Sequence, residues 1–191
     1  HYPLRRQRQM CIRDRPTPDG IRIGMPVFCP DAPRQAYAKQ RLHDDELPYF
    51  TPGHQALLLE VGEHRVAPAI CYESMFMAHA AVARERGADL YLVSVAKTAK
   101  GIREGYAHYP EVARELGMPV LMANCVGPAD TFIGAGGSAA WDSQGHLLAS
   151  LDDHSEGLIV LDTRSASAIT LPLAPYLSLI HISEPTRQAE I

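Results

Sequence analysis

Short apolar stretches alternate with amphipathic stretches through most of the chain. We expect strands where a few apolar residues lie between turn residues, and helices where apolar residues recur every three or four positions. The predicted strands cover 21–28, 56–61, 65–71, 88–95, 119–126 and 156–163, and residues 136–153 are predicted to form a hairpin. Helices are predicted for 74–87 and 106–117, and each ends on a glycine. Because strands and helices alternate in the middle of the chain, the sequence predicts parallel crossover units and a mixed α/β fold.

Composition narrows the class of protein. The chain has 191 residues, of which 46% are hydrophobic and 21% charged, and these values are typical of one globular domain. A net charge of −4 gives no electrostatic footprint for nucleic acid. No apolar run approaches the roughly 20 residues that a membrane helix needs. We therefore expect a cytoplasmic protein with small-molecule partners, and neither a nucleic-acid nor a membrane partner.

The two ends of the chain differ in character from its middle. Residues 1–15 carry five arginines and no apolar periodicity, and residues 177–191 read "LSLIHISEPTRQAEI". Both resemble translated sequencing-adapter read-through, so we exclude them from fold reasoning. The expectation is a disordered flank over 1–15, a domain over 16–176 and an adapter-like tail over 177–191. A basic arm and a frayed C-terminal tail form the alternative.

One cysteine lies at a place typical of reactive groups. In "RVAPAICYES", Cys71 ends a predicted strand and precedes a predicted helix. Open α/β sheets bind ligands at the carboxyl ends of their strands, where a helix N-terminus offers free N–H groups and favours an anion such as a thiolate. Because cysteine is also among the most frequently buried residue types, position alone leaves a packed core thiol as the alternative.

A lysine and a glutamate seven residues apart form the second candidate. They are Lys39 and Glu46, in the segment "YAKQRLHDDELPYFTPG". Such a pair by itself is typical of a solvated loop, in which an exposed ion pair contributes little. The segment alone therefore does not indicate a site.

Several stretches in a fixed order change this interpretation. Along the chain come "YAK", Glu46, "YFTPG", "ICYE", "GADLYLVS", "EVARELG", "LMANCVG" and "DSQGHLLA". From about Ile21 to Thr163 this set resembles the carbon-nitrogen hydrolase family, also called the nitrilase superfamily. The resemblance implies an α/β fold of the α-β-β-α sandwich type, here incomplete at the N-terminus. It also implies hydrolysis of non-peptide carbon-nitrogen bonds, of amidase type, without a metal or a cofactor.

The resemblance also implies roles for single residues, within a Glu-Lys-Cys triad. Cys71 is expected to be the nucleophile that forms an acyl-thioester with a small amide, carbamoyl compound or nitrile. Lys39 is expected to stabilise the oxyanion, together with the backbone N–H of Tyr72, and Glu46 to position Lys39 and the substrate. Glu73 and Glu115 match further family positions, which we interpret as structural.

The remaining glutamate of the triad is missing from this sequence. In the family, the general base lies on a strand before the lysine, but no glutamate precedes Glu46 here. Since a positioned base typically contributes about 100-fold to 10,000-fold to the rate, we expect an N-terminally truncated chain with little or no activity. Two alternatives stay open, an acyltransferase that uses the same thioester and a non-catalytic fragment or pseudoenzyme. Family members commonly form homodimers, which the sequence neither shows nor excludes.

The other residues that could carry chemistry favour ordinary structural roles. Four cysteines lack the CxxC spacing of zinc sites, and the nine histidines lack any ligand spacing, so we expect no metal and surface or capping roles for histidines such as His79 and His108. Lys97 and Lys100 follow the predicted strand 88–95, where the family shapes its substrate pocket. They are either part of that pocket or exposed to solvent.

Overall fold

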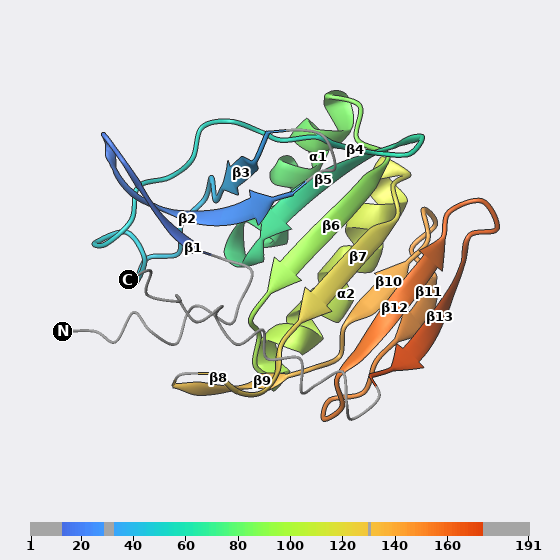
Figure 1. Ribbon diagram of the computed structural model, residues 1–191. Coiled ribbons are helices and arrows are strands. Elements are labelled where there is room, and N and C mark those ends of the chain that lie inside the picture. The colour runs from blue at the N-terminus through green and yellow to red at the C-terminus, as the bar shows by residue number, and fades with distance from the viewer. Residues whose placement is uncertain (1–12, 29–32, 130, 174–191) are drawn as a thin grey trace, which may run out of the picture.

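A six-stranded sheet forms the centre of the structure, a computed structural model in which residues 13–28, 33–129 and 131–173 are described (Figure 1). Its strands, in spatial order, are β11 (Leu147–Ser150), β10 (Ala139–Trp141), β7 (Val120–Asn124), β6 (Leu90–Val95), β5 (His64–Ile70) and β4 (Leu59–Val61). The three central strands β5, β6 and β7 are parallel, and the outer strands pair antiparallel. Parallel neighbours need crossover connections, and two helices supply them here.

The helices α1 (Met77–Glu85) and α2 (Ala99–Leu116) cover one face of this sheet (Figure 1). Small residues such as Ala69 and Ala80 let the backbones approach closely, and larger side chains fill the space between them. The buried residues on this face include Ala67, Ala69, Ala80, Ala83, Val93, Val95, Tyr109, Val112, Met118, Val120, Met122 and Trp141. Helix α2 ends at Gly117, whose left-handed φ of 57° suits a glycine.

A smaller antiparallel sheet packs against the central sheet near β5. It contains β1 (Arg13–Thr17), β2 (Gly20–Val27) and β3 (Gln35–Ala38). Ile23, Tyr37 and Leu42 form a second buried cluster with Ile70 of β5. Because successive side chains of a strand point to opposite faces, Ile70 faces away from the helices, which Ala69 contacts. The small sheet therefore packs on the opposite face from α1 and α2.

Two hairpins complete the described chain. One contains β8 (Val126–Ala129) and β9 (Phe132–Ala135), and the other contains β12 (Gly157–Asp162) and β13 (Ser167–Pro172). Four cross-strand apolar residues of the second hairpin are between 43% and 58% exposed, namely Leu158, Val160, Ile169 and Leu171. This hairpin contributes a ribbon beside β11 and little to the core.

The mixed α/β fold predicted from the sequence is confirmed, with corrections at the level of single elements. A short 3₁₀ helix, η2 (Cys71–Met75), follows β5, so α1 begins three residues later than expected. Helix α2 begins seven residues earlier, at Ala99, because its first turns contain two glycines that hide the helical pattern. One of them, Gly105, is required by packing, since a Cβ there would lie 2.9 Å from the Tyr109 ring.

Five strands were not predicted: β1, β3, β8, β9 and β13. Strand β1 begins at Arg13, so its first three residues belong to the flank set aside as 1–15. Residues 1–12 and the tail 177–191 lie outside the described residues. Short strands of this kind lack enough alternating positions to be recognised before their partners are known.

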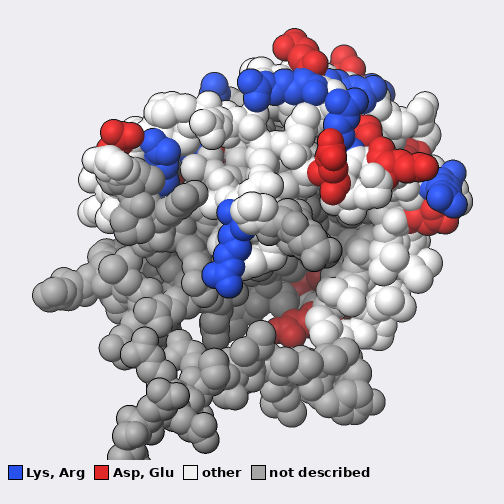
Figure 2. All heavy atoms as spheres, turned by 45° about the horizontal axis from the view of Figure 1, so that its top comes forward, with Lys and Arg blue, Asp and Glu red and all other residues white. Residues whose placement is uncertain are grey.

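Charge is mixed on the face shown in Figure 2, where Lys and Arg side chains lie beside Asp and Glu side chains. Within the described part of the chain, no helix is long and apolar enough to cross a membrane.

We expect Trp141→Ala to lower the free energy of unfolding by about 3–5 kcal/mol, because a large side chain leaves a cavity in a close-packed core. Trp141 is only 1% exposed, and its ring contacts those of Tyr106 and Tyr109 at centroid distances of 5.3 and 5.8 Å. Urea unfolding measures the loss. The control is Ile133→Ala, because Ile133 is 71% exposed and should change stability by no more than about 0.5 kcal/mol.

Candidate active site

Cys71 occupies a strained turn at the carboxyl end of β5. Its φ is +48°, in the left-handed region that residues with a side chain rarely adopt. Such a conformation costs about 1–3 kcal/mol and persists only where neighbouring contacts hold it. The turn leads directly into η2, so Cys71 is presented at the edge of the sheet where the parallel strands end.

Contacts from α2 hold this turn. The Ser74 hydroxyl lies 2.5 Å from the Cys71 carbonyl oxygen and 2.8 Å from the Tyr109 hydroxyl. His108 Nε2 lies 3.1 Å from the Ser74 carbonyl oxygen and donates to it. Burial raises the pKa of Tyr109, so its hydroxyl stays protonated at neutral pH. Ser74 thus connects the backbone of Cys71 to the middle of α2.

Glu73 joins the same turn to the segment that carries Lys39. Its carboxylate is fully buried and accepts four hydrogen bonds. Oε1 accepts from the Ile70 N–H at 2.7 Å and from the Tyr37 hydroxyl at 2.8 Å. Oε2 accepts from the Gln40 N–H at 2.6 Å and from the Arg41 N–H at 3.3 Å. One carboxylate therefore ties the residue before Cys71 to the two residues after Lys39.

His79 extends this buried network. Its Nε2 lies 2.9 Å from the Tyr37 hydroxyl, and its Nδ1 lies 2.7 Å from the Tyr91 hydroxyl. Burial is the main reason that the pKa of His79 is lowered, and the Glu73 carboxylate opposes this only in part. Burial also raises the pKa of Tyr37 and of Tyr91, so both phenols keep their protons. The hydrogen bonds assign a neutral His79 that donates from Nε2 to Tyr37 and accepts at Nδ1 from Tyr91.

Lys39 and Glu46 form a direct ion pair. Lys39 is only 2% exposed, and its Nζ lies 2.6 and 2.7 Å from the two carboxylate oxygens of Glu46. The Lys39 backbone is fixed on both sides, because its N–H donates to Ile23 O and its carbonyl accepts from the Gly53 N–H. Gly53 is required there, since a Cβ would lie 2.4 Å from the Ala38 carbonyl oxygen. The Glu46 carboxylate also accepts from the His43 N–H at 2.7 Å, so the ammonium has a fixed counter-ion.

Aromatic contacts make a second connection between the two segments. The ring of Tyr72 packs edge-on against His43 and Phe76, with centroids 4.8 and 4.9 Å away. The Arg41 guanidinium lies 3.9 Å from the centre of the Phe76 ring, a cation–π contact. The Tyr72 side chain of η2 thus packs between His43 of the Lys39–Glu46 segment and Phe76, which follows η2.

The ends of three parallel strands bring further groups beside Cys71. Cys71 follows β5, Lys97 lies two residues beyond β6, and Cys125 follows β7. Cys71 packs against both buried clusters, that of the helices and that of the small sheet. Burial raises the pKa of Cys125, and the charge of Cys71 adds to this shift.

The structure brings the four sequence-predicted residues together in two linked pairs. Lys39 and Glu46 are in direct contact, and Cys71 and Tyr72 share one turn. Their catalytic roles remain predictions. Tyr37, Ser74, His79 and Tyr109 were missed as positioning residues, and the only signal in the sequence was the polar pair Glu-Ser inside an apolar stretch. The surface or capping role expected for histidines is wrong for His79, which belongs to the buried network.

The described residues also limit where ligands could bind. Among them, no group of three or more His, Cys, Asp or Glu side chains could hold a metal ion. A cavity of about 410 Å³ lies between α1, β5 and the segment 53–58, and neither Cys71 nor Lys39 lines it. The Cys71 turn and the Lys39–Glu46 ion pair thus lie outside the lining of this cavity.

Comparison with known proteins gives one family. Residues 27–172 match the family model described as carbon-nitrogen hydrolase. An amidase of the nitrilase superfamily from Nesterenkonia, solved as a cysteine-to-alanine mutant, is 25% identical with a TM-score of 0.71, and the match covers 87% of this chain and 62% of that one. The glutamine-dependent NAD+ synthetase of Acinetobacter baumannii is 21% identical with a TM-score of 0.73, over 86% of this chain and 33% of that one.

A third similar structure is Nit3 of Saccharomyces cerevisiae, a member of branch 10 of the nitrilase superfamily. It is 18% identical with a TM-score of 0.69, and the match covers 94% of this chain and 65% of that one. The chain thus spans less than two thirds of the length of each of these three proteins. No curated protein sequence matches it significantly.

We expect Glu73→Gln to lower the free energy of unfolding by about 2–4 kcal/mol, because a neutral amide replaces a buried anion that accepts four hydrogen bonds. The NH₂ group of the new amide would also face N–H donors, to which it cannot form hydrogen bonds. Urea unfolding measures the loss, and Glu63→Gln in the exposed β4–β5 turn is the matched control, with a change of no more than about 0.5 kcal/mol. Equal effects of the two substitutions would contradict the role given to Glu73.

Stability should fall as the pH drops from 7 to 5. The pKa of His79 is lowered in the folded state, so the unfolded chain binds its proton more readily below about pH 6.5. We expect His79→Gln to reduce this pH dependence, measured as the difference in unfolding free energy between the two pH values. His154→Gln is the control and should not reduce it, because Asp153 raises the pKa of the exposed His154.

Proposed function

Because this chain belongs to the carbon-nitrogen hydrolase family, we propose that its site acts on the carbon-nitrogen bond of a small amide, with Cys71 as the nucleophile. The observation that carries the proposal is the strained turn at Cys71, which Glu73 ties to the segment of the Lys39–Glu46 ion pair. A strained non-glycine residue at a strand end is typical of a functional site.

The proposed reaction passes through a thioester. The Cys71 thiol loses its proton, its sulfur attacks the amide carbon to form a carbon-sulfur bond, and the carbon-nitrogen bond breaks as ammonia leaves with the proton that the thiol lost. Water then adds to the acyl carbon and the carbon-sulfur bond breaks, which releases the acid and returns a proton to the thiol. Each step places negative charge on the former carbonyl oxygen.

Lys39 is the proposed partner of that oxyanion, with the backbone N–H of Tyr72 as a second donor. A fixed donor of this kind contributes about 3–4 kcal/mol to the transition state. Glu46 keeps the ammonium in place before and after the charge develops. Among the described residues, no carboxylate is hydrogen-bonded to the Cys71 thiol. None of the described carboxylates is therefore assigned as the general base.

We further infer the layer order of the family, an α-β-β-α sandwich. Supporting this, α1 and α2 cover one face of the central sheet, and β2 and β3 pack on the other through Ile23 and Tyr37. The Cys71 turn then lies between two sheets, where Lys39 approaches it from the second.

A small amide is the substrate class that the relatives support. The Nesterenkonia amidase was solved as a cysteine-to-alanine mutant in complex with butyramide. A Glu-to-Leu mutant of the same amidase shows covalent addition of the acetamide moiety of fluoroacetamide at its active-site cysteine. Both compounds are primary amides with short acyl groups, and we extend that class to this chain.

Fluoroacetamide gives a direct test of the nucleophile. We expect the Cys71 sulfur to displace fluoride, so that one carboxamidomethyl thioether forms and hydrogen fluoride is released. Mass spectrometry of peptides locates the adduct, which should be absent from Cys71→Ser and unchanged in Cys125→Ser, because burial raises the pKa of the Cys125 thiol and slows its reaction. Labelling of Cys71 no faster than that of a short free peptide would contradict the proposal.

Release of ammonia from butyramide tests turnover. Because no described residue is assigned as the general base, we expect slow release, which is lost in Cys71→Ala and is reduced about 100-fold to 1,000-fold in Lys39→Met, the effect of removing one oxyanion donor. If fluoroacetamide labels Cys71 but no ammonia is released, the chain has an activated thiol without turnover. That result would favour a non-catalytic protein.

A further inference from the structure

We propose that Ser74 and Tyr109 are positioning residues for the oxyanion site, because together they orient and polarise the peptide unit that joins Cys71 to Tyr72. The C=O of that unit accepts a hydrogen bond from the Ser74 hydroxyl, and its N–H is the second oxyanion donor of the proposed reaction. This inference rests on the proposed amide chemistry of Cys71. It gives the two hydroxyl groups an effect on the strength of one donor, in addition to their support of the turn.

The two hydroxyl groups form a short chain of hydrogen bonds that ends on the Cys71 carbonyl oxygen. The Ser74 Oγ lies 2.5 Å from that oxygen and 2.8 Å from the Tyr109 hydroxyl. Because a carbonyl oxygen only accepts, the single proton of the Ser74 hydroxyl goes to Cys71, and Tyr109 donates to Ser74. Burial raises the pKa of Tyr109, so the phenol keeps the proton that it donates. The chain therefore runs in one direction, from Tyr109 through Ser74 to Cys71.

The end of this chain and the oxyanion donor belong to one planar peptide unit. In a trans peptide the C=O and the N–H point in opposite directions, and resonance couples the electrons of the two groups. A hydrogen bond onto the Cys71 oxygen draws electrons toward it and makes the Tyr72 N–H more positive. Each bond in such a chain strengthens the next by about 10–30%. Ser74 thus acts at one end of the unit on what the other end can bind.

Helix α2 holds both hydroxyl groups in place. Ser74 and Tyr109 are fully buried, and the Tyr109 ring contacts that of Trp141 at a centroid distance of 5.8 Å. A Cβ at Gly105 would lie 2.9 Å from the Tyr109 ring, so the glycine leaves room for the phenol. The neighbouring His108 donates to the Ser74 carbonyl oxygen at 3.1 Å. Ser74 is therefore held through its side chain and its backbone, and its hydroxyl points to one place.

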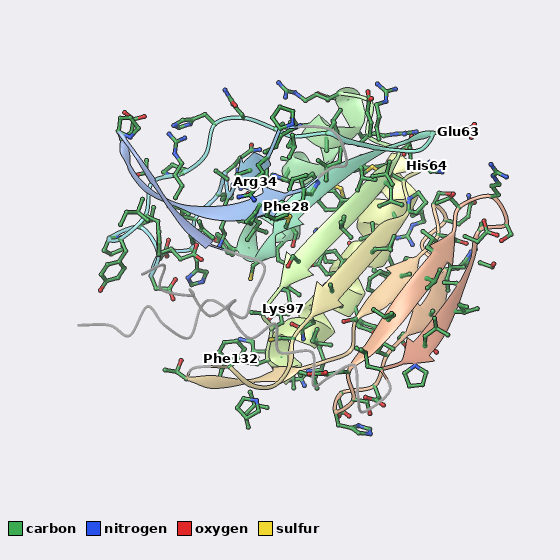
Figure 3. The ribbon with its side chains drawn as sticks, in the orientation of Figure 1. Phe28, Arg34, Glu63, His64, Lys97 and Phe132 are labelled. Carbon is green, nitrogen blue, oxygen red and sulfur yellow. The ribbon has the colours of Figure 1, made fainter. Side chains whose placement is uncertain are left out.

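The course of α2 along the sheet explains why it reaches this turn. Strand β5 begins at His64, and Cys71 follows its last residue, at the end of the sheet that Lys97 marks in Figure 3, opposite His64. Helix α2 begins two residues beyond Lys97 and covers one face of the sheet. Its middle then contacts η2 through the hydrogen bond between Tyr109 and Ser74.

Stability alone does not require the two hydroxyl groups. When both partners of a buried hydrogen bond are replaced by apolar groups of the same shape, the change in stability is small. The double variant Ser74→Ala/Tyr109→Phe removes both O–H groups together, so neither hydroxyl is left buried without its partner. We expect it to fold with a urea midpoint close to that of the wild type, while the Cys71 peptide loses the chain.

Reversible addition of butyraldehyde tests the oxyanion site without turnover. The Cys71 sulfur bonds to the aldehyde carbon, the carbon-oxygen double bond becomes single, and the thiol proton passes to the oxygen. That oxygen takes the place of the oxyanion, so the affinity for the aldehyde depends on the Tyr72 N–H. Fluoroacetamide instead loses fluoride from a CH₂ carbon, and no charge develops on its amide oxygen.

One competition assay gives both quantities for the full chain. The rate at which fluoroacetamide alkylates Cys71, followed by mass spectrometry, measures the reactivity of the thiol. Protection of Cys71 by increasing butyraldehyde gives the Kd of the aldehyde. A loss of donor strength changes only the second quantity, whereas a loss of the turn changes both.

We expect butyraldehyde to bind the double variant about tenfold more weakly, and Tyr109→Phe alone about threefold more weakly, because each bond of the chain supplies a fraction of the 100-fold to 1,000-fold effect of one donor. The alkylation rate should stay within about twofold of the wild type in both. Tyr106→Phe is the matched control, since its hydroxyl lies one turn earlier in α2 and donates to the Gly137 carbonyl oxygen at 3.1 Å. It should change the Kd of the aldehyde by less than about 1.5-fold.

Three results would overturn the positioning role. The first is an unchanged aldehyde Kd in the double variant. The second is a fall in alkylation rate by the same factor as the loss of aldehyde affinity, because the hydroxyl groups would then only support the turn. The third is a wild-type chain that butyraldehyde does not protect.

Ammonia release from butyramide separates this inference from the proposed function. If the wild type releases ammonia and the double variant binds butyraldehyde as tightly as the wild type, the amide chemistry stands and the positioning role is wrong. If the aldehyde affinity falls as expected in the double variant but the wild type releases no ammonia, the positioning role stands and the proposed function is wrong.

Discussion

A single buried carboxylate constrains the site more than any other group. Glu73 accepts hydrogen bonds from Ile70, which ends the central strand, and from Tyr37, Gln40 and Arg41, which surround Lys39 in the smaller sheet. Because each donor would be left unpaired in a dry interior without it, the two sheets can meet in only one register. Cys71, the proposed nucleophile, and Lys39, the proposed oxyanion partner, are carried by these two segments. Their relative position is thus fixed by Glu73, to which the proposed reaction gives no chemical step.

The two lysines of low exposure differ in what surrounds their charge. Lys39 keeps a permanent counter-ion, so its charge is present at a fixed place whatever is bound, as the stabilisation of a transient oxyanion requires. Lys97 is anchored through its backbone by the Asn124 side chain, and the stem of its own side chain packs on Gly101. The ion pair with Glu46 therefore distinguishes Lys39 as the lysine that the proposed chemistry uses.

The sequence predicted the features that depend on local pattern. The strands around Cys71, the general α/β alternation and the family resemblance all follow from short stretches, because burial imposes its period on consecutive residues. Lys39 and Glu46 are seven residues apart and could be paired by inspection. The network of Tyr37, Glu73 and His79 could not, since the hydrogen bonds that connect the segment of Tyr37 to Glu73 and His79 join residues 32 to 42 positions apart. The early start of α2 was hidden for a related reason: Gly101 and Gly105 lower helix propensity, and their use is visible only beside the Lys97 stem and the Tyr109 ring.

The left-handed backbone at Cys71 has a consequence for how this position changes over generations. Glycine adopts such a φ without the penalty that any side chain meets, so a glycine here would make the chain more stable by about 1 kcal/mol or more. Folding alone therefore favours losing the cysteine. A lineage that no longer needed a thiol at this turn would be expected to drift toward glycine. Cysteine at a place where the backbone prefers glycine fits the proposed role of a nucleophile, because a thiol needed for reaction would be kept at the expense of stability.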